Sequence, residues 1–328
     1  MWPYFEKEMF KPNLPRLEEM MASWVKKKGF PLVTITRNYQ DGSLKVQQDP
    51  FPNKKNWNLW WIFVDYCYAD GNGQVLGDFW MENVTQKFVF ANLHPRRGLI
   101  ANLQHAGYYI VNYDNYNWDL IARILHRSHY IIDVRNREQI TSDLYWLYLY
   151  NVIEDKIVQN IYSYLAHEEE FIPWTSPLKL FKHMLKSNMI SQKRWIRILI
   201  NQSLSRLGYI TRADDTPMRI KLRSALLDLS CEMEEPQCII YARQQFHLWK
   251  QSQHPFRVIP IPPDYQEVLI TAALKHPSSM VESQENERFI LKVLDYERVK
   301  SWPAKYQQLL MIVKSVPSMT SLANMSHR

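Results

Sequence analysis

Ten histidines are the side chains in this sequence best suited to hold a metal ion or to move a proton. A catalytic zinc is often held by an H-E-x-x-H helix, in which the histidines lie one turn apart and the glutamate is the general base. No histidine here has another four residues later; His167-Glu168 begins the pattern, but Phe171 follows. His126 and His129 could share a helix face, yet no carboxylate or thiolate is placed to complete a site. The sequence therefore predicts no metal site.

Other reaction and binding classes also lack their motifs. There is no G-x-S-x-G nucleophile turn, and no cysteine stands in a recognisable nucleophile context. The eight glycines form neither G-x-G-x-x-G nor G-K-[ST] phosphate loops. The net charge is +7 and the pI is near 9.1, but the basic residues are scattered among 33 acidic ones. A solvated basic surface is therefore favoured over a nucleic-acid partner, and no cofactor is expected in this chain.

The elements that must position any site change type partway along the chain. Short β-prone runs come first, and Asp41-Gly42 and the segment 70–73 are strong hairpin turns. Beyond residue 113, apolar residues recur at helical spacing, with prolines in the short connections. We predict an α+β multidomain fold, a small β-sandwich followed by an all-α helical-repeat domain shaped as a curved solenoid. The expected strands are 32–37, 43–48, 59–66, 74–84, 87–91, 99–103 and 108–113.

The junction between the two parts is the most distinctive stretch. Residues 107–114 read G-Y-Y-I-V-N-Y-D and Trp118 follows, which predicts a strand that turns directly into a helix capped by Asp114. This stretch resembles the G-Y-Y-R-V-N-Y-D-x-x-x-W junction of the zinc aminopeptidases related to aminopeptidase N, with Ile110 in place of the usual arginine. Further motifs in that family's order cover roughly residues 15 to 315. They are M-M-A-S-W at 20–24, N-R-E-Q-I-T-S-D at 136–143, the stretch from Tyr164 to Trp174, and a C-x6-C pair.

The resemblance implies the function that we expect. Residues 1–28 would be a residual helix of a missing catalytic domain, 29–113 the β-sandwich, and 114–328 a helical cap domain truncated at its C-terminal end. The chain would then be the non-catalytic C-terminal region of a zinc metallopeptidase, which braces and caps the active site and encloses the peptide chamber. Zinc belongs to intact members; without H-E-x-x-H this chain is expected to be inactive alone. Trp80-Met81-Glu82-Asn83 only superficially resembles the family's G-A-M-E-N motif and is predicted to be strand.

The cysteines and the N-glycosylation sequons indicate the cellular compartment of the protein. Cys231 and Cys238 match the family's C-x6-C, and Pro236 between them would place them at the ends of adjacent helices, close enough for a disulfide. Such a bond implies an oxidising compartment, and family context suggests the plasma membrane or the extracellular space. The sequons at Asn83, Asn201 and Asn324 matter only in a secreted chain. No apolar run is long enough to span a bilayer, so membrane attachment is expected only through an absent N-terminal region.

The family resemblance also implies binding partners for this chain. A peptide substrate and the missing catalytic domain are the expected partners, and homodimerisation is left open. Arg137 and Asp143, within the N-R-x-Q motif, are the candidate peptide contacts, although a salt bridge that fixes the first two helices is the favoured alternative for both. The alternative function is a stand-alone, degenerate scaffold that binds peptides or proteins, which the replacements at Ile110, Glu138 and Thr141 would suit.

We expect the purified chain to release no N-terminal residues from chromogenic amino-acid substrates with added zinc, because the sequence provides no zinc-binding motif. The measurement is absorbance over time with and without a chelator. Robust turnover that a chelator abolishes would contradict this prediction.

Overall fold

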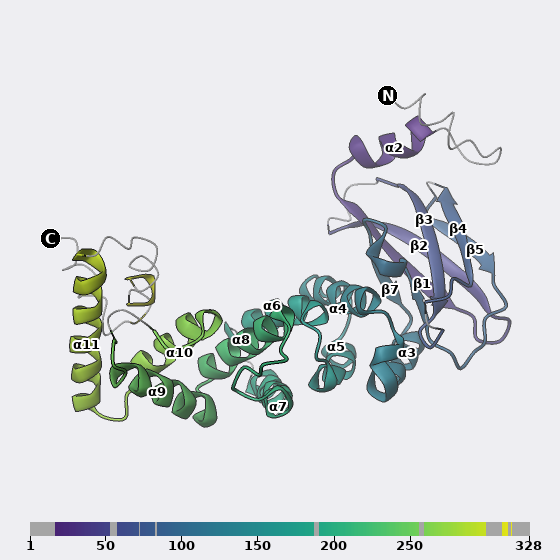
Figure 1. The fold of residues 1–328 in the computed structure, drawn as a ribbon. Coiled ribbons are helices and arrows are strands. Elements are labelled where there is room, and N and C mark those ends of the chain that lie inside the picture. Colours follow the sequence, from purple (N-terminus) through teal and green to yellow (C-terminus); the bar gives the residue numbers. More distant parts are fainter. Residues whose placement is uncertain are drawn as a thin grey trace. The chain divides into compact units, whose positions relative to one another are not determined.

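The chain is described by a computed structural model that covers residues 17–52, 58–71, 73–82, 84–186, 190–255, 259–299, 310–313 and 316. It forms two compact units, Met1–Phe181 and Lys182–Arg328. The first unit contains every strand among the described residues and the helices that follow them; the second is helical (Figure 1). The division lies inside a helix, whereas the change from strand to helix lies at residues 113–115. The expected boundaries of the domains stay a prediction.

Two antiparallel hairpins, β1–β2 and β3–β4, and three further strands form the sheets of the first unit. A 4-stranded sheet has the order β5-β2-β1-β7, and a 3-stranded sheet has the order β4-β3-β6. Every run predicted as strand contains a strand, which includes residues 80–82, so the predicted fold class of sheets followed by helices is confirmed. The elements are α2 (Leu17–Val25), β1 (Phe30–Arg37), β2 (Ser43–Phe51), β3 (Trp61–Tyr68), β4 (Gly77–Glu82), β5 (Gln86–Phe90), β6 (Leu99–Ala101), η1 (Leu103–His105) and β7 (Ile110–Tyr113).

Alternation of apolar and polar residues explains these strands. In β1 and β2, Val33, Ile35, Leu44 and Val46 are buried, while polar neighbours point outward. The turn between β1 and β2 places Gly42 at a φ of +71°, where an added Cβ would collide with the backbone of Leu93. A residue without a side chain is therefore required at this turn.

The junction between strands and helices depends on Asp114. Its Oδ1 accepts from Asn117 N at 2.9 Å, which caps α3 (Asn115–Ser128), and from the Tyr39 hydroxyl at 2.7 Å. Its Oδ2 accepts from Arg37 N at the end of β1, at 3.1 Å. β7 pairs with β1 in parallel, so both strands reach this carboxylate together. The predicted helix cap is confirmed, and the same side chain also fastens the helix to the sheet.

Helices continue the first unit and make up the second (Figure 1). Thr216 caps α8 by accepting from Arg219 N, and Pro217 occupies the first position of the helix, where its missing N–H has no cost. Fully buried Arg223 donates to the carbonyls of Leu207 and Gly208 and pairs with Asp215 at 2.7 Å, which fixes the connection before α8. The helices are α4 (Val134–Leu149), α5 (Asp155–Tyr162), α6 (Thr175–Lys186), α7 (Ile190–Leu207), α8 (Pro217–Glu232), α9 (Pro236–Lys250), α10 (Pro263–Lys275) and α11 (Met280–Val299).

Successive helices of the second unit pack on one another, α7 on α8, α8 on α9 and α9 on α10, with α10 also against α8. This packing is what a stacked helical array requires, while a curved solenoid stays a prediction. None of the described helices is both long and apolar enough to cross a membrane. The expectations for residues 1–16, for Asn83 and Asn324, and for the chain beyond 316 lie outside the described residues.

The cysteines are placed as the sequence predicted. Cys231, near the end of α8, is bonded to Cys238 in the first turn of α9, with 5.3 Å between their Cα atoms. Cys67 is a buried free thiol in β3, and burial raises its pKa to about 12. It is therefore a packing residue at neutral pH.

Replacing Cys231 and Cys238 with serine should lower the free energy of unfolding by about 2 to 3 kcal/mol, because the disulfide restricts the unfolded chain. Urea titration followed by circular dichroism measures this change. Cys67→Ala in both backgrounds is the control for thiol effects. A pair variant as stable as the parent would show that the bond contributes nothing.

Candidate functional site

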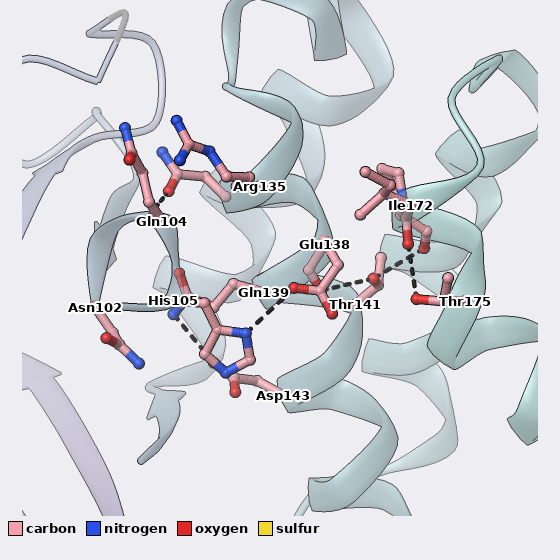
Figure 2. Close-up of polar contacts among 12 residues, drawn as sticks. Asn102, Gln104, His105, Arg135, Glu138, Gln139, Thr141, Asp143, Ile172 and Thr175 are labelled. Carbon is pink, nitrogen blue, oxygen red and sulfur yellow. Dashed lines mark hydrogen bonds and ion pairs between the residues drawn. The ribbon is translucent and has the colours of Figure 1, made fainter. Parts of the chain in front are cut away.

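One face of α4 supplies polar groups to the backbone between β6 and β7 (Figure 2). Asn136, Gln139 and Asp143 share this face at spacings of three and four residues. Gln104 N donates to Asn136 Oδ1 at 2.6 Å, Gln139 Nε2 donates to the Ala101 carbonyl at 2.7 Å, and Val111 N donates to Asp143 Oδ2 at 3.2 Å. These three residues belong to the N-R-x-Q segment, so the motif specifies how the first helices attach to the sandwich.

The segment held by α4 has an unusual backbone. Asn102, Gln104 and His105 all have left-handed φ values, at 60°, 57° and 58°. Such conformations cost free energy for residues other than glycine, and the conformations persist only where surrounding contacts stabilise them. The Asn102 amide group does so by accepting from Gly107 N at 2.7 Å and donating to the carbonyls of Gly107 and Tyr109. The result is a fixed loop that presents the His105 ring.

His105 lies between two carboxylates (Figure 2). Its Nδ1 is 3.2 Å from Glu138 Oε2. This bond raises the pKa of His105 against the opposing effect of burial, and the charge of Asp143 acts in the same direction as Glu138. The ring therefore keeps its proton to a higher pH than a free histidine.

Asp143 is the most perturbed carboxyl group of this cluster. Only 2% of the residue is exposed, and burial raises the pKa of Asp143 to about 8, although His105 and two hydrogen bonds to the carboxylate oppose the shift. Oδ2 accepts from Val111 N and from Gln139 Nε2, whereas Oδ1 is buried and has no hydrogen-bond partner. A buried oxygen without a partner is costly and demands an explanation, such as a proton, a water molecule or a ligand.

These groups open into a pocket of about 550 Å³ beside α4, which we call the α4 pocket. His105, Ser142 and Asp143 provide its polar lining. Aromatic rings provide most of the rest, and two of them are solvent-accessible, Tyr108 at 71% and Trp146 at 37%. A few polar groups among rings suit recognition of a small or extended organic ligand.

A second pocket, of about 280 Å³, lies on the other side of the same loop, and Tyr108 lines both. Trp24, Trp61, Phe63 and Trp80 surround it, so we call it the tryptophan pocket. Trp24 Nε1 donates to the Trp61 carbonyl at 2.8 Å, which attaches α2 to β3. The loop thus separates an apolar pocket from a mixed one.

The two residues proposed from the sequence as peptide contacts are both buried. Arg137, at 6% exposure, pairs with Glu168 at 2.6 Å and donates to the Ile132 carbonyl, so it ties α4 to the segment after α5. Asp143 faces β7 and the α4 pocket instead, and the two do not pair with each other. Contact of either residue with a peptide stays a prediction.

The other sequence candidates lie elsewhere. Asn201 is inside α7, where its side-chain amide donates to Glu235 Oε2 at 2.8 Å, and its glycosylation stays a prediction. His126 bonds to the Asn160 carbonyl, and His129 packs on the Tyr164 ring. Within the described ranges, no group of three histidine, cysteine or acidic side chains could hold a metal ion, so these residues do not fit a zinc site.

The sequence alone did not predict His105 or the aromatic residues that line the α4 pocket as parts of a site. His105 meets Glu138 across 33 positions, and no local spacing signals that pairing. The usable signal was the polar stripe of α4, since its three buried polar side chains, Asn136, Gln139 and Asp143, must bond to something.

Unfolding free energy should fall as pH rises from 5 to 7, because the folded state holds a proton on Asp143 that the unfolded state has lost. The pKa of Asp143 is 3.8 in the unfolded chain and is raised to about 8 in the folded chain. Its contribution to stability is therefore fully present below pH 3.8 and is lost as the pH rises towards about 8. The slope from this group approaches about 1.4 kcal/mol per pH unit. Urea titrations across this range measure it; Asp143→Asn should flatten the slope, and exposed Asp214→Asn should not. Equal slopes in both variants would contradict the assignment.

Comparison with known proteins finds that the chain is similar to part of several aminopeptidases. It is 25% identical over 300 residues to membrane alanyl aminopeptidase of Manduca sexta, which covers 86% of this chain and 29% of that protein. It is 27% identical over 258 residues to human endoplasmic reticulum aminopeptidase 2, covering 72% of this chain and 26% of the relative. Human aminopeptidase N is 30% identical over 177 residues, which is 51% of this chain.

The chain therefore spans less than a third of the length of these relatives. The profile of the family described as ERAP1-like C-terminal domain matches residues 99–310. That range runs from β6 through the helices of both units, and it includes the junction at Asp114 and every residue that lines the α4 pocket except Phe30. On this match, the chain belongs to the ERAP1-like C-terminal domain family.

Proposed function

We propose that this chain is the non-catalytic C-terminal region of an aminopeptidase N-like metallopeptidase, which braces and caps the active site and encloses the peptide. The observation that carries the proposal is the family match over residues 99–310 in a chain that corresponds to about a quarter of its relatives. Zinc would belong to the catalytic part, because the described residues of this chain offer no ligand set for it. The chain's own contribution is then binding and positioning.

Exposed aromatic surface supports the bracing role. Phe63 is 44% exposed and Tyr108 is 71% exposed beside the tryptophan pocket, and Val25 at the end of α2 is 71% exposed. Exposed apolar side chains of this kind suit an interaction site. A catalytic domain that precedes α2 in the chain would offer a partner to cover them.

The α4 pocket supports contact with peptide. Its rings offer apolar contact, and His105, Ser142 and Asp143 offer polar groups that could orient a peptide. Remote contacts of this type use binding energy to position the reacting end of a substrate. The Cys231–Cys238 disulfide supports an oxidising, extracellular or luminal location for the whole protein.

Peptides of about ten residues should bind the purified chain more tightly than the corresponding single amino-acid amide, because only a peptide spans from the α4 pocket to neighbouring surface. Fluorescence anisotropy of labelled peptide measures the affinity. Tyr108→Ala should weaken binding several-fold. Tyr130→Ala is the matched control, because Tyr130 is 74% exposed and lines neither pocket. Absence of binding at millimolar concentrations of the chain would contradict the peptide-enclosing role.

The bracing role is tested by the transcript that encodes Met1. An H-E-x-x-H domain in the same reading frame upstream supports it. A native protein that begins at Met1 and keeps this length overturns it and favours the stand-alone binding module.

A further inference from the structure

The α4 pocket contains a buried acidic group, Asp143, whose charged form is poorly stabilised by its surroundings. Asp143 lines the pocket, and its buried Oδ1 has no hydrogen-bond partner. His105 is bonded to Glu138, and its charge only partly offsets the effect of burial on Asp143, while the charge of Glu138 adds to that effect. The phenols of Tyr109, Tyr113 and Tyr162 feel the charge of Asp143, and burial raises their pKa values well above the ordinary value. These phenols are neutral at physiological pH.

The charges around the α4 pocket favour a positively charged ligand. The pair His105–Glu138 sums to zero when His105 is protonated and to one negative charge when it is not. An ionised Asp143 adds a further negative charge in either case. An anion would therefore meet repulsion, whereas an organic cation would supply the partner that a buried carboxylate requires. A metal ion is disfavoured because the described residues hold no ligand group of three.

The walls of the α4 pocket fit an organic cation. Tyr108 packs on Phe30 at 5.2 Å between ring centroids, and Trp146 packs edge-on against Tyr145 at 5.2 Å and stacks on Tyr150 at 6.3 Å. These contacts hold the rings in place before any ligand arrives. Faces of tyrosine and tryptophan attract ammonium and guanidinium groups and also cover the methylene stems that carry them.

We propose that the α4 pocket binds the cationic end of an arginine or lysine side chain of a peptide, with Asp143 as its counter-ion and Tyr108 and Trp146 against its stem. This inference rests on the proposed function and adds to it the class of peptide that is retained. The preference applies to a side chain and not to the peptide's reacting amine, which the proposed function assigns to the catalytic part.

Proton release is a distinctive consequence of this arrangement. Burial keeps Asp143 protonated in the empty pocket near neutral pH, since its pKa is raised to about 8. A bound cation stabilises the carboxylate, so binding at pH 7 expels about one proton. His105 loses its own proton as pH rises, which removes a repulsive charge. The titration of Asp143 therefore strengthens cation binding as pH rises towards about 8.

The test compares two pentapeptides that differ in one charge, acetyl-Ala-Ala-Arg-Ala-Ala-amide and the same peptide with citrulline, which is uncharged and nearly isosteric. Isothermal titration of the full chain at pH 8 should give at least about tenfold tighter binding of the arginine peptide. Repeating the titration at pH 7 in buffers of different ionisation enthalpy should show release of about one proton.

Three variants locate the site. Asp143→Asn should abolish the preference for arginine over citrulline and the proton release. Trp146→Leu and Tyr108→Ala should each weaken binding of the arginine peptide several-fold. Both residues are substantially exposed, so these variants should fold even if Asp143→Asn does not. Tyr130→Ala should bind as the parent does.

The outcomes separate this inference from the proposed function. Equal binding of both peptides would overturn the cation site and leave the peptide-enclosing role standing, whereas no binding of either peptide, or of the longer peptides, would remove both. A preference that survives in Asp143→Asn, or in Trp146→Leu and Tyr108→Ala together, would place the cation elsewhere and overturn the assignment. Arginine binding without proton release would exclude Asp143 as counter-ion.

Discussion

The polar face of α4 is the constraint on which the first unit depends. The backbone between β6 and β7 leaves strand geometry, so its amides and carbonyls lose their partners in the sheets. Asn136 provides a partner for Gln104 in this segment, and Gln139 and Asp143 bond to Ala101 at the end of β6 and to Val111 in β7. Each buried polar group left unpaired would cost roughly 1 to 3 kcal/mol. The loop, the helix and both sheets therefore form one unit, in which no part can adopt its geometry without the others.

That constraint also creates the chemistry of the α4 pocket. Val111 N donates to the Asp143 carboxylate, and burial of this side chain disfavours its charge. The left-handed backbone at Gln104 and His105 places an imidazole next to that carboxylate. Attachment of helix to sheet and the capacity to bind a ligand are therefore properties of the same residues.

Much of the architecture could be read from the sequence because local rules specify it. Alternating residues marked the strands, Asp114 before Trp118 marked the capped helix, and Pro236 between two cysteines marked a disulfide between adjacent helices. The candidate site could not be read in the same way. His105 meets Glu138 across 33 positions and Arg137 meets Glu168 across 31, and no turn rule predicts a left-handed glutamine or histidine. Such pairings exist only once the sheets have set the distances.

The parallel pairing of β7 with β1 has a consequence for how the molecule is made. Arg37 and Asp114 are separated by 77 positions, and everything between them belongs to the sandwich. During synthesis, β1 leaves the ribosome long before the strand that completes its sheet. Contacts across such distances carry a large loop-closure cost and form slowly. The hairpins can assemble early, but α3 acquires its cap only after the whole sandwich has emerged, so the helices that follow are joined to a sheet that has just closed.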